Sequence, residues 1–314
     1  MNGVFPSSSD DEPVDPGLVP PSSSELVAGD EYHPLVDTRL LATYTHRALD
    51  SVVENLDSGD NLSPNFLGNP GLGAAGDFQT AARTYDGVTV SLYHLFSDGW
   101  LAQASYTWSR LHGNHAGSFR PVAGWNEPTL RSDIHFASQQ TNRTGPLPND
   151  RTHTVRVFGA REFDLTPKLS ASVGLSYRGQ SGTPINYLGG HPRAGMGETF
   201  ILPSGSTGER TPWVHSIDPR LGVSYRIDRS KINTVSLNLE AFNLFNFQEV
   251  TRVNEHYTYA NVLPLETEVE AGQLTPDRVR TVDGRPLGAA NPEFKKPIQY
   301  QAPRQVRLGL RYTF

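Results

Sequence analysis

The sequence predicts an all-β fold: an antiparallel transmembrane β-barrel segment of about eight strands, with short periplasmic turns and long extracellular loops. Three observations predict it. Apolar and polar residues alternate with a period of two, tight turns alternate with very long connections, and the chain stops on an aromatic residue after an alternating strand. Helices and closed barrels are the structures that pair every backbone group inside a bilayer. The alternation therefore favours a barrel wall with one lipid face and one lumen face.

The alternation marks each expected strand. It is clearest at the end of the chain, where the apolar positions are Val306, Leu308, Leu310, Tyr312 and Phe314. Strand-like runs occupy residues 37–47, 88–96, 100–108, 151–162, 169–178, 221–228, 235–241 and 305–314.

The connections between these runs differ greatly in length. Residues 97–99, 164–167 and 229–231 are tight turns rich in turn-forming residues, whereas residues 48–83, 112–150, 179–214 and 245–302 are long connections. Loops above about 15 residues are uncommon in compact soluble domains. In an antiparallel meander, strict alternation of short and long connections puts every long one at the same end, as in outer-membrane barrels.

Aromatic residues fall near both ends of the expected strands. We expect membrane-interface side chains at Phe96, Trp100, Tyr106, Trp108, Tyr177 and Tyr225. The alternative is that aromatics are simply enriched in strands for their β-propensity.

Composition excludes several other classes of protein. The 314 residues carry a net charge of −6, which argues against nucleic-acid binding. The absence of cysteine excludes disulfides, thiol catalysis and Cys-based zinc sites. No apolar run is long enough for a transmembrane helix, and the mean hydropathy of −0.45 is compatible with a barrel whose strands are half polar.

The first part of the chain differs from the rest. Residues 1–34 are rich in Ser, Pro, Asp and Glu and are expected to be a disordered lead, without the features of a signal peptide. Residues 35–314 are expected to be the outer-membrane barrel segment.

The last strand resembles the C-terminal β-signal of bacterial outer-membrane proteins. Its alternation ends on Phe314. The resemblance implies that Val306, Leu308, Leu310, Tyr312 and Phe314 are read by the barrel-assembly machinery as an edge strand.

Four further segments resemble TonB-dependent transporters of the Oar-like (carboxypeptidase-regulatory-like) branch. Residues 235–246 read VSLNLEAFNLFN and resemble the NLFN signature near the end of these transporters. Residues 86–110, 147–153 (LPNDRTH) and 177–184 (YRGQSGTP) are similar to other segments of that branch. The resemblance covers roughly residues 35–314.

This resemblance implies a bacterial outer-membrane location and a transport function. Family members are 22-stranded barrels with a plugged lumen. About eight strands correspond to the C-terminal third of such a barrel, so we expect a fragment that lacks signal peptide, plug and TonB-contacting segment. TonB would then act only through the missing N-terminal part, while the long loops would bind an unknown extracellular ligand.

The candidate chemistry is sparse. His112 and His115 form an H-x-x-H pair with His135 and His153 downstream, but we expect solvated loop histidines and no metal, because metal sites need a rigid ligand set. Glu266, Glu268 and Glu270 read as a solvated acidic face. Candidate lumen-facing polar residues are Arg178, Arg226, Glu240, Arg307 and Arg311. No catalytic motif appears, so we expect no enzyme, no catalytic residue and no cofactor.

Two other functions stay open at this point. One is a self-contained eight-stranded outer-membrane barrel that acts in adhesion or envelope integrity. The other is a secreted soluble β-sandwich that binds glycan, which would require inward apolar faces and shorter loops.

Overall fold

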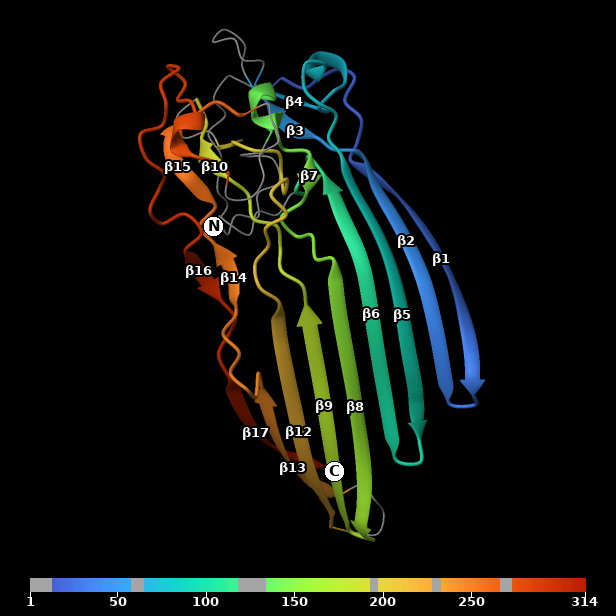
Figure 1. The fold of residues 1–314 in the computed structure, drawn as a ribbon. Helices are drawn as coiled ribbons and strands as arrows, with labels where there is room; N and C mark the ends of the chain where they lie inside the picture. The colour runs from blue at the N-terminus through green and yellow to red at the C-terminus, as the bar shows by residue number, and fades with distance from the viewer. Residues whose placement is uncertain (1–12, 58–64, 118–133, 193–196, 228–232, 266–272) are drawn as a thin grey trace, which may run out of the picture.

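The long strands form a single curved antiparallel sheet (Figure 1). The computed structural model describes residues 13–57, 65–117, 134–192, 197–227, 233–265 and 273–314. The strands lie in the order β1-β2-β5-β6-β8-β9-β12-β13-β17, and a short strand β7 (Gly145–Pro146) pairs with β6. Their bounds are β1 Ser22–Leu35, β2 Thr38–Ser51, β5 Arg83–Ser97, β6 Trp100–Gly113, β8 His153–Thr166, β9 Leu169–Gln180, β12 Val214–Arg226, β13 Thr234–Phe242 and β17 Gln305–Thr313. The all-β antiparallel architecture is as predicted. The sheet is not closed, and β1 and β17 are its edges.

Strand β1 corrects the sequence-based expectation for the start of the chain. Residues 22–34 were expected to belong to a disordered lead, but they pair with β2 over the registers Leu26↔His46, Ala28↔Tyr44 and Tyr32↔Leu40. Every residue of β1 is exposed. Because an edge strand is held by backbone hydrogen bonds on one side only, its side chains are hardly constrained, and the apolar pattern is weak. Residues 1–12 of the expected lead lie outside the described residues.

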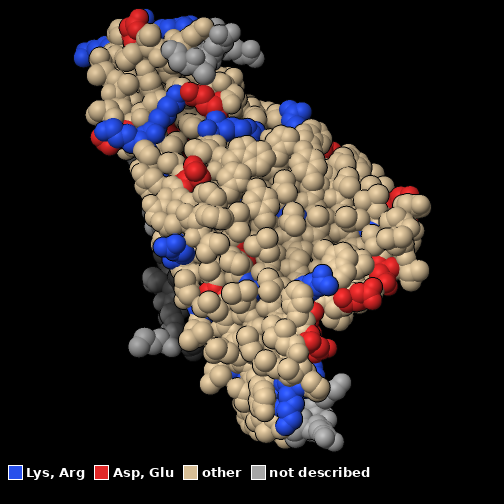
Figure 2. Space-filling model, turned by 60° about the horizontal axis from the view of Figure 1, so that its bottom comes forward, with Lys and Arg blue, Asp and Glu red and all other residues tan. Residues whose placement is uncertain are grey.

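The two faces of the sheet differ in chemistry. One face, here called the apolar face, carries cross-strand pairs such as Leu40↔Leu92 and Val90↔Tyr106. The other, the polar face, carries hydroxyl pairs: Thr89 to Thr107 at 2.9 Å and Ser224 to Ser236 at 2.8 Å. Figure 2 shows a broad wall with few charged side chains over its middle and with charges gathered toward its ends. The alternation predicted from sequence therefore separates two environments.

The tight turns lie at one end of the sheet, here called the turn end (Figure 1). Between β5 and β6, Asp98 and Gly99 have φ values of 50° and 79°. Two positive φ values match a type I′ hairpin turn, whose twist suits the flanking strands. In the turn between β8 and β9, the Thr166 hydroxyl accepts the Lys168 and Leu169 amides. The expected turn at residues 229–231 lies outside the described residues.

The long connections gather at the opposite end, the loop end, and fold there into a cap (Figure 1). Strand β10 (Leu188–Gly190) pairs antiparallel with β11 (Glu198–Phe200) and parallel with β15 (His256–Asn261). β14 (Val250–Val253) pairs with β16 (Pro297–Tyr300), and β3 (Glu54–Leu56) with β4 (Phe66–Gly68). The cap has its own buried core, formed by Tyr187, Ile201, Leu202, Tyr257, Val262, Leu274, Val279 and Leu287. The described parts of the long loops thus pack against one another and bury apolar side chains.

Helical structure is limited to short 3-10 turns in the part of the chain that the structure describes. They are η1 Gly73–Ala75, η2 Ala137–Gln140 and η3 Pro276–Arg278. Among these residues no helix has the length and apolar character needed to cross a membrane.

The core of the cap generates a first prediction. Ile201 is fully buried, so Ile201→Ala leaves a cavity and should destabilise the cap by about 2–5 kcal/mol. We expect faster protease cleavage within residues 185–290, with the strands still resistant. Leu263→Ala is the matched control, because Leu263 is exposed and follows the buried Val262 in the chain. This variant should be cleaved at the wild-type rate. Equal cleavage of all three proteins would contradict the role of this core.

Candidate functional site

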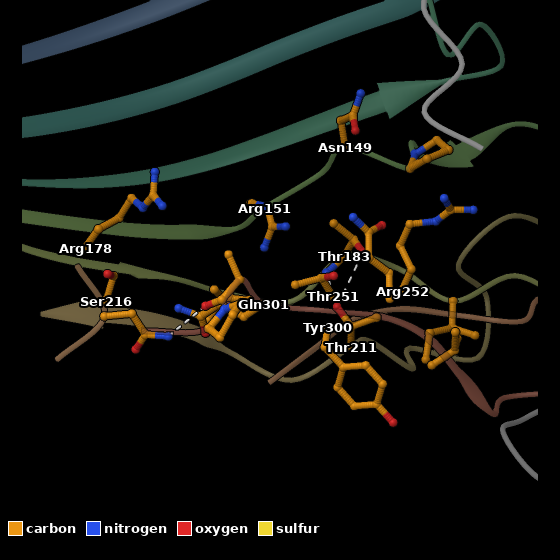
Figure 3. A pocket seen from close by; sticks show the side chains of 18 of the residues that line it. Asn149, Arg151, Arg178, Thr183, Thr211, Ser216, Thr251, Arg252, Tyr300 and Gln301 are labelled. Atoms are coloured by element: carbon orange, nitrogen blue, oxygen red, sulfur yellow. Dashed lines mark hydrogen bonds between the residues drawn. The ribbon is translucent and has the colours of Figure 1, made fainter. Parts of the chain in front are cut away.

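A cavity lies on the polar face at the loop end, between the sheet and the cap. It has a volume of about 640 Å³. Side chains from β9, β12, β13, β14 and the segments before β8 and β17 surround it. The lining includes Asn149, Arg151, Arg178, Thr183, Thr211, Ser216, Asp218, Asn243, Thr251, Arg252, Glu255, Tyr300, Gln301 and Gln305. Figure 3 labels most of these side chains, which lie around one space.

The segment at residues 147–153 forms one wall of this pocket. Asp150 closes a turn, with its amide donating to Leu147 O, and its carboxylate accepts the Leu111 amide at 2.6 Å. The Arg210 guanidinium forms an ion pair with the other carboxylate oxygen. Asp150 is nearly fully buried, and these contacts fix the neighbouring Asn149 and Arg151 at the pocket.

The segment at residues 181–184 lies directly against that wall. The His153 amide donates to the Ser181 hydroxyl at 3.0 Å, and the Arg151 guanidinium donates to Ser181 O at 2.6 Å. Thr183 exchanges backbone and side-chain hydrogen bonds with Thr211 at 2.9 Å. Gly182 is required there, because a Cβ would lie 1.6 Å from Thr211 O.

The two asparagines of the NLFN segment stabilise the wall of the pocket that lies next to the last strand. Asn243 and Asn246 both have positive φ, 51° and 55°, a conformation that asparagine tolerates. The Asn243 amide group donates to Phe247 O and Ala302 O, and Asn246 Oδ1 accepts the Arg304 amide. The segment was expected from its motif, and the structure gives the motif a physical role, since it ties the end of β13 to the approach to β17.

Three arginines surround the cavity: Arg151, Arg178 and Arg252 (Figure 3). None of them forms an ion pair with a carboxylate among the described residues. Burial, and then the nearby charge of Arg178, lowers the pKa of Arg151. The pocket therefore gathers three guanidinium groups that form no ion pair with a carboxylate of the described residues.

Of the two carboxylates in the lining, one accepts hydrogen bonds from neighbouring residues and the other is only partly ionised. Asp218 Oδ1 accepts the Ser216 hydroxyl at 2.6 Å and the Asn243 amide at 2.7 Å. Glu255 accepts the Asn186 amide at 2.6 Å, and burial raises the pKa of Glu255 to about 7. Near neutral pH, Glu255 is thus only partly charged.

Two buried polar atoms in the lining have no hydrogen-bond partner in the described structure. They are the hydroxyl of Thr251 and Oε1 of Gln301, whose Nε2 donates to His215 O. Buried polar groups normally have partners, so unpaired atoms at a cavity are positions where a solute or water can bind. The chemistry of the pocket suits an oxygen-rich, negatively charged solute.

The structure places the five predicted lumen residues on the polar face, but only Arg178 reaches the pocket. Glu240 accepts from Arg307 Nε at 2.6 Å and lies 3.5 Å from Arg220 Nε. Arg226 lies 3.5 Å from Asp164, and Arg311 pairs in register with Ser236. Sequence reasoning missed Arg151 and Arg252. Arg151 lies inside a segment whose motif was recognised, but Arg252 lies in a long loop without periodicity.

The predicted interface aromatics are partly exposed, at different levels of the sheet. Phe96 and Trp100 lie at the turn end, Tyr225 lies near the end of β12, and Tyr106, Trp108 and Tyr177 lie toward the loop end. On β17, the apolar side chains of the expected assembly signal are exposed.

The histidines correct a second expectation. His115 and His135 were expected to be solvated, but both are buried. His115 Nε2 lies 2.7 Å from Glu54, and His135 Nδ1 lies 2.8 Å from Asn55 O, because the first two long loops pack together. No group of three or more potential metal ligands occurs in the described ranges. Glu266, Glu268 and Glu270 lie outside them.

Long antiparallel strands with one apolar and one polar face, tight turns at one end and a folded cap at the other are typical of the wall of an outer-membrane β-barrel protein. The comparisons with known proteins give the particular class. Over 311 residues the chain is 51% identical to the TonB-dependent transporter Oar of Myxococcus xanthus, an alignment that covers 96% of this chain and 29% of that protein. The chain thus corresponds to a C-terminal barrel portion of a TonB-dependent receptor, located in the outer membrane, as the motifs predicted. No protein-family model matches the chain.

Two solved structures are also similar. The ferric-catecholate import receptor Fiu of E. coli K12 in its closed form has a TM-score of 0.42 and 16% identity, over 76% of this chain and 25% of that chain. OmpT of Vibrio cholerae has a TM-score of 0.31 and 10% identity, over 94% of this chain and 56% of that chain.

Glu255 generates a prediction about pH. In the unfolded chain Glu255 ionises near its ordinary pKa of 4.5, but in the folded protein near 7. Between these values the folded state keeps a proton that the unfolded state has lost, so stability falls as pH rises through this window. Glu255→Gln should remove this loss, which makes the cap more stable than wild type at pH 8, by up to about 3 kcal/mol, and similar to it at pH 4.5.

Protease susceptibility of residues 245–302 at several pH values measures this effect. Glu249→Gln, in the same loop but outside the pocket, is the control and should keep the wild-type pH dependence. An identical pH dependence in Glu255→Gln and wild type would contradict the assignment.

Proposed function

We propose that this chain forms one wall of the barrel of an outer-membrane transporter, and that the pocket contacts an anionic, oxygen-rich solute on its way through the barrel. The observation that supports this most directly is the set of three arginines without an ion-paired carboxylate among the described residues, at the end of the polar face where the cap begins. In this proposal β1, β2, β5, β6, β8, β9, β12, β13 and β17 cross the membrane. The turn end lies in the periplasm and the loop end outside the cell.

The activity of the whole transporter involves more than this chain, which spans less than a third of its Oar relative. We propose that solute is captured by the cap and released inward when a plug is displaced through TonB. Parts of the protein beyond this chain would make the TonB contact. The barrel segment would begin at Ser22, where β1 starts, and continue to the end of the chain.

The two edges of the sheet fit this arrangement. β1 and β17 each have one side without a strand partner in the described structure. Inside a bilayer such edges must be paired, so further strands of the barrel would complete them. We propose that β17, with Val306, Leu308, Leu310, Tyr312 and Phe314, is the strand recognised by the barrel-assembly machinery.

The remaining roles are those of a scaffold. Phe96, Trp100 and Tyr225 would lie at the periplasmic interface, and Tyr106, Trp108 and Tyr177 at the external one. Arg226, Glu240, Arg307 and Arg311 would line the lumen. We propose no catalytic activity and no cofactor, in line with a relative that is a transporter. The β-sandwich alternative required inward apolar faces and shorter loops, whereas the apolar face of the long strands is exposed, with Leu92 and Leu175 among its residues.

The membrane orientation of the faces can be tested at neighbouring positions of one strand. Leu175 is exposed on the apolar face of β9, and Ser176 is on the polar face. Leu175→Arg should cost about 2–4 kcal/mol in a membrane and reduce the fraction that refolds in detergent, because the charge would face lipid. Ser176→Arg should refold like wild type. Heat-modifiable mobility on a gel measures the folded fraction, and equal refolding of both variants would contradict the proposed faces.

The solute chemistry can be tested at the pocket. We expect citrate, used as a tricarboxylate probe, to bind the detergent-solubilised protein, and Arg178→Gln with Arg252→Gln to weaken binding by about tenfold or more. Arg311→Gln removes a positive charge from the same face away from the pocket and should leave binding unchanged. Isothermal titration calorimetry measures these affinities. An equal loss in the Arg311 variant would indicate a general charge effect and contradict a pocket site.

A further inference from the structure

A row of five rings lies on the apolar face at the loop end. It consists of Tyr106, His153, Trp213, His215 and Tyr177, here called the ring row. Neighbouring ring centroids lie 5.9 to 6.2 Å apart, and their planes differ by only 11° to 18°. The row is separate from the pocket, which lies on the opposite face of the sheet.

The strand registers place these rings side by side. His153 begins β8 opposite Trp108 of β6, and His215 of β12 lies opposite Gly179 of β9. At Gly179 a Cβ would lie 2.4 Å from the Tyr177 hydroxyl, so the glycine leaves room for the Tyr177 ring to lie along the strand toward His215. The row thus crosses β6, β8, β9 and β12 near their loop ends.

Hydrogen bonds hold both imidazoles in a fixed orientation. The Tyr106 hydroxyl lies 2.8 Å from His153 Nδ1, and the Tyr177 hydroxyl lies 3.0 Å from His215 Nδ1. When the tyrosine donates to Nδ1, the ring hydrogen is on Nε2, and a protonated imidazole also carries a hydrogen there. Neither Nε2 has a hydrogen-bond partner within the described ranges. With the tyrosines as donors, each histidine presents an N–H group that no residue in the described ranges uses.

The surroundings of the row favour an acceptor-rich ligand. No carboxylate belongs to it. Asp86, an acidic side chain on this face, is already engaged by Tyr44 and His46 at 2.8 Å each. Arg110, paired in register with Asp86, adds an exposed positive charge on the same face. Toward the middle of the sheet this face becomes aliphatic, with Val157 and Leu175.

We propose that the ring row binds the headgroup of a phosphorylated glycolipid in the outer leaflet of the membrane. Amphipathic rings at the ends of membrane strands lie at headgroup level, where one part is apolar and the other is wet. The two Nε2–H groups and Arg110 would donate to phosphate oxygens, the ring faces would contact the sugar, and the aliphatic part of the face would contact the acyl chains. The inference depends on the outer-membrane location and is independent of the proposed solute pocket.

The test uses the protein reconstituted in nanodiscs of zwitterionic phospholipid with a small fraction of a bisphosphorylated glucosamine glycolipid. The lipid retained after detergent extraction is quantified by mass spectrometry. Removing both donors while keeping flat rings, in the double variant His153→Phe with His215→Phe, should lower retention by about tenfold. The corresponding His→Gln double variant keeps an N–H donor at each position and should retain more lipid than the Phe variant.

His94→Phe is the matched control. His94 also stacks on an aromatic ring of the apolar face, Trp100 at 3.7 Å, but at the turn end. It should retain glycolipid like wild type, and heat-modifiable mobility shows that each variant is folded. Equal retention by wild type and the Phe double variant, or an equal loss in His94→Phe, would overturn the proposal.

A second comparison needs no variant and applies even where a substitution prevents folding. The wild-type protein is given the same glycolipid with its phosphates removed, and retention should fall by a similar factor. Equal retention of both lipids would overturn phosphate recognition. Displacement of the bound lipid by inorganic phosphate alone would show that the site takes free anion and would overturn the assignment to a headgroup.

Discussion

The need to pair every backbone N–H and C=O group within a bilayer is the constraint on which the rest of this structure depends. Long antiparallel strands, each hydrogen-bonded to its neighbours, suit this constraint, and the described sheet has open edges at β1 and β17. Because successive side chains in a strand point to opposite faces, the same pairing divides the residues into two sets. Leu40 and Leu92 meet on one face, while Thr89 and Thr107 meet on the other.

The gathering of the long connections at one end of the sheet follows from the same antiparallel meander. Strict alternation of short and long connections brings all long segments together, and they can then bury surface against one another. Ile201 and Val262 belong to different connections, yet both are fully buried in one core. The pocket is formed where this cap meets the polar face. Its walls are short motifs held by buried polar groups such as Asp150 and by asparagines with positive φ such as Asn243.

The two faces offer different chemistry at the same end of the sheet. On the polar face, guanidinium groups without carboxylate partners surround a cavity, and Glu255 is partly neutral there because it is buried. On the apolar face, tyrosine, histidine and tryptophan rings lie nearly parallel across the strands. The first arrangement suits a solute that passes through a barrel, and the second suits a molecule that stays in the surrounding membrane.

The sequence by itself determined the strands, their two faces and the asymmetry of the connections, since a period of two is a local signal and each face has its own environment. It also contained the motifs around Asp150 and Asn243, but not what they hold together. Only the tertiary structure decided that β1 is a strand, because an exposed edge constrains its side chains weakly. Only the tertiary structure showed that Arg178 and Arg252 line the same pocket, and that His115 is buried against Glu54. Those contacts connect segments far apart in a chain whose loops have no periodic pattern, so they depend on how the loops pack against each other.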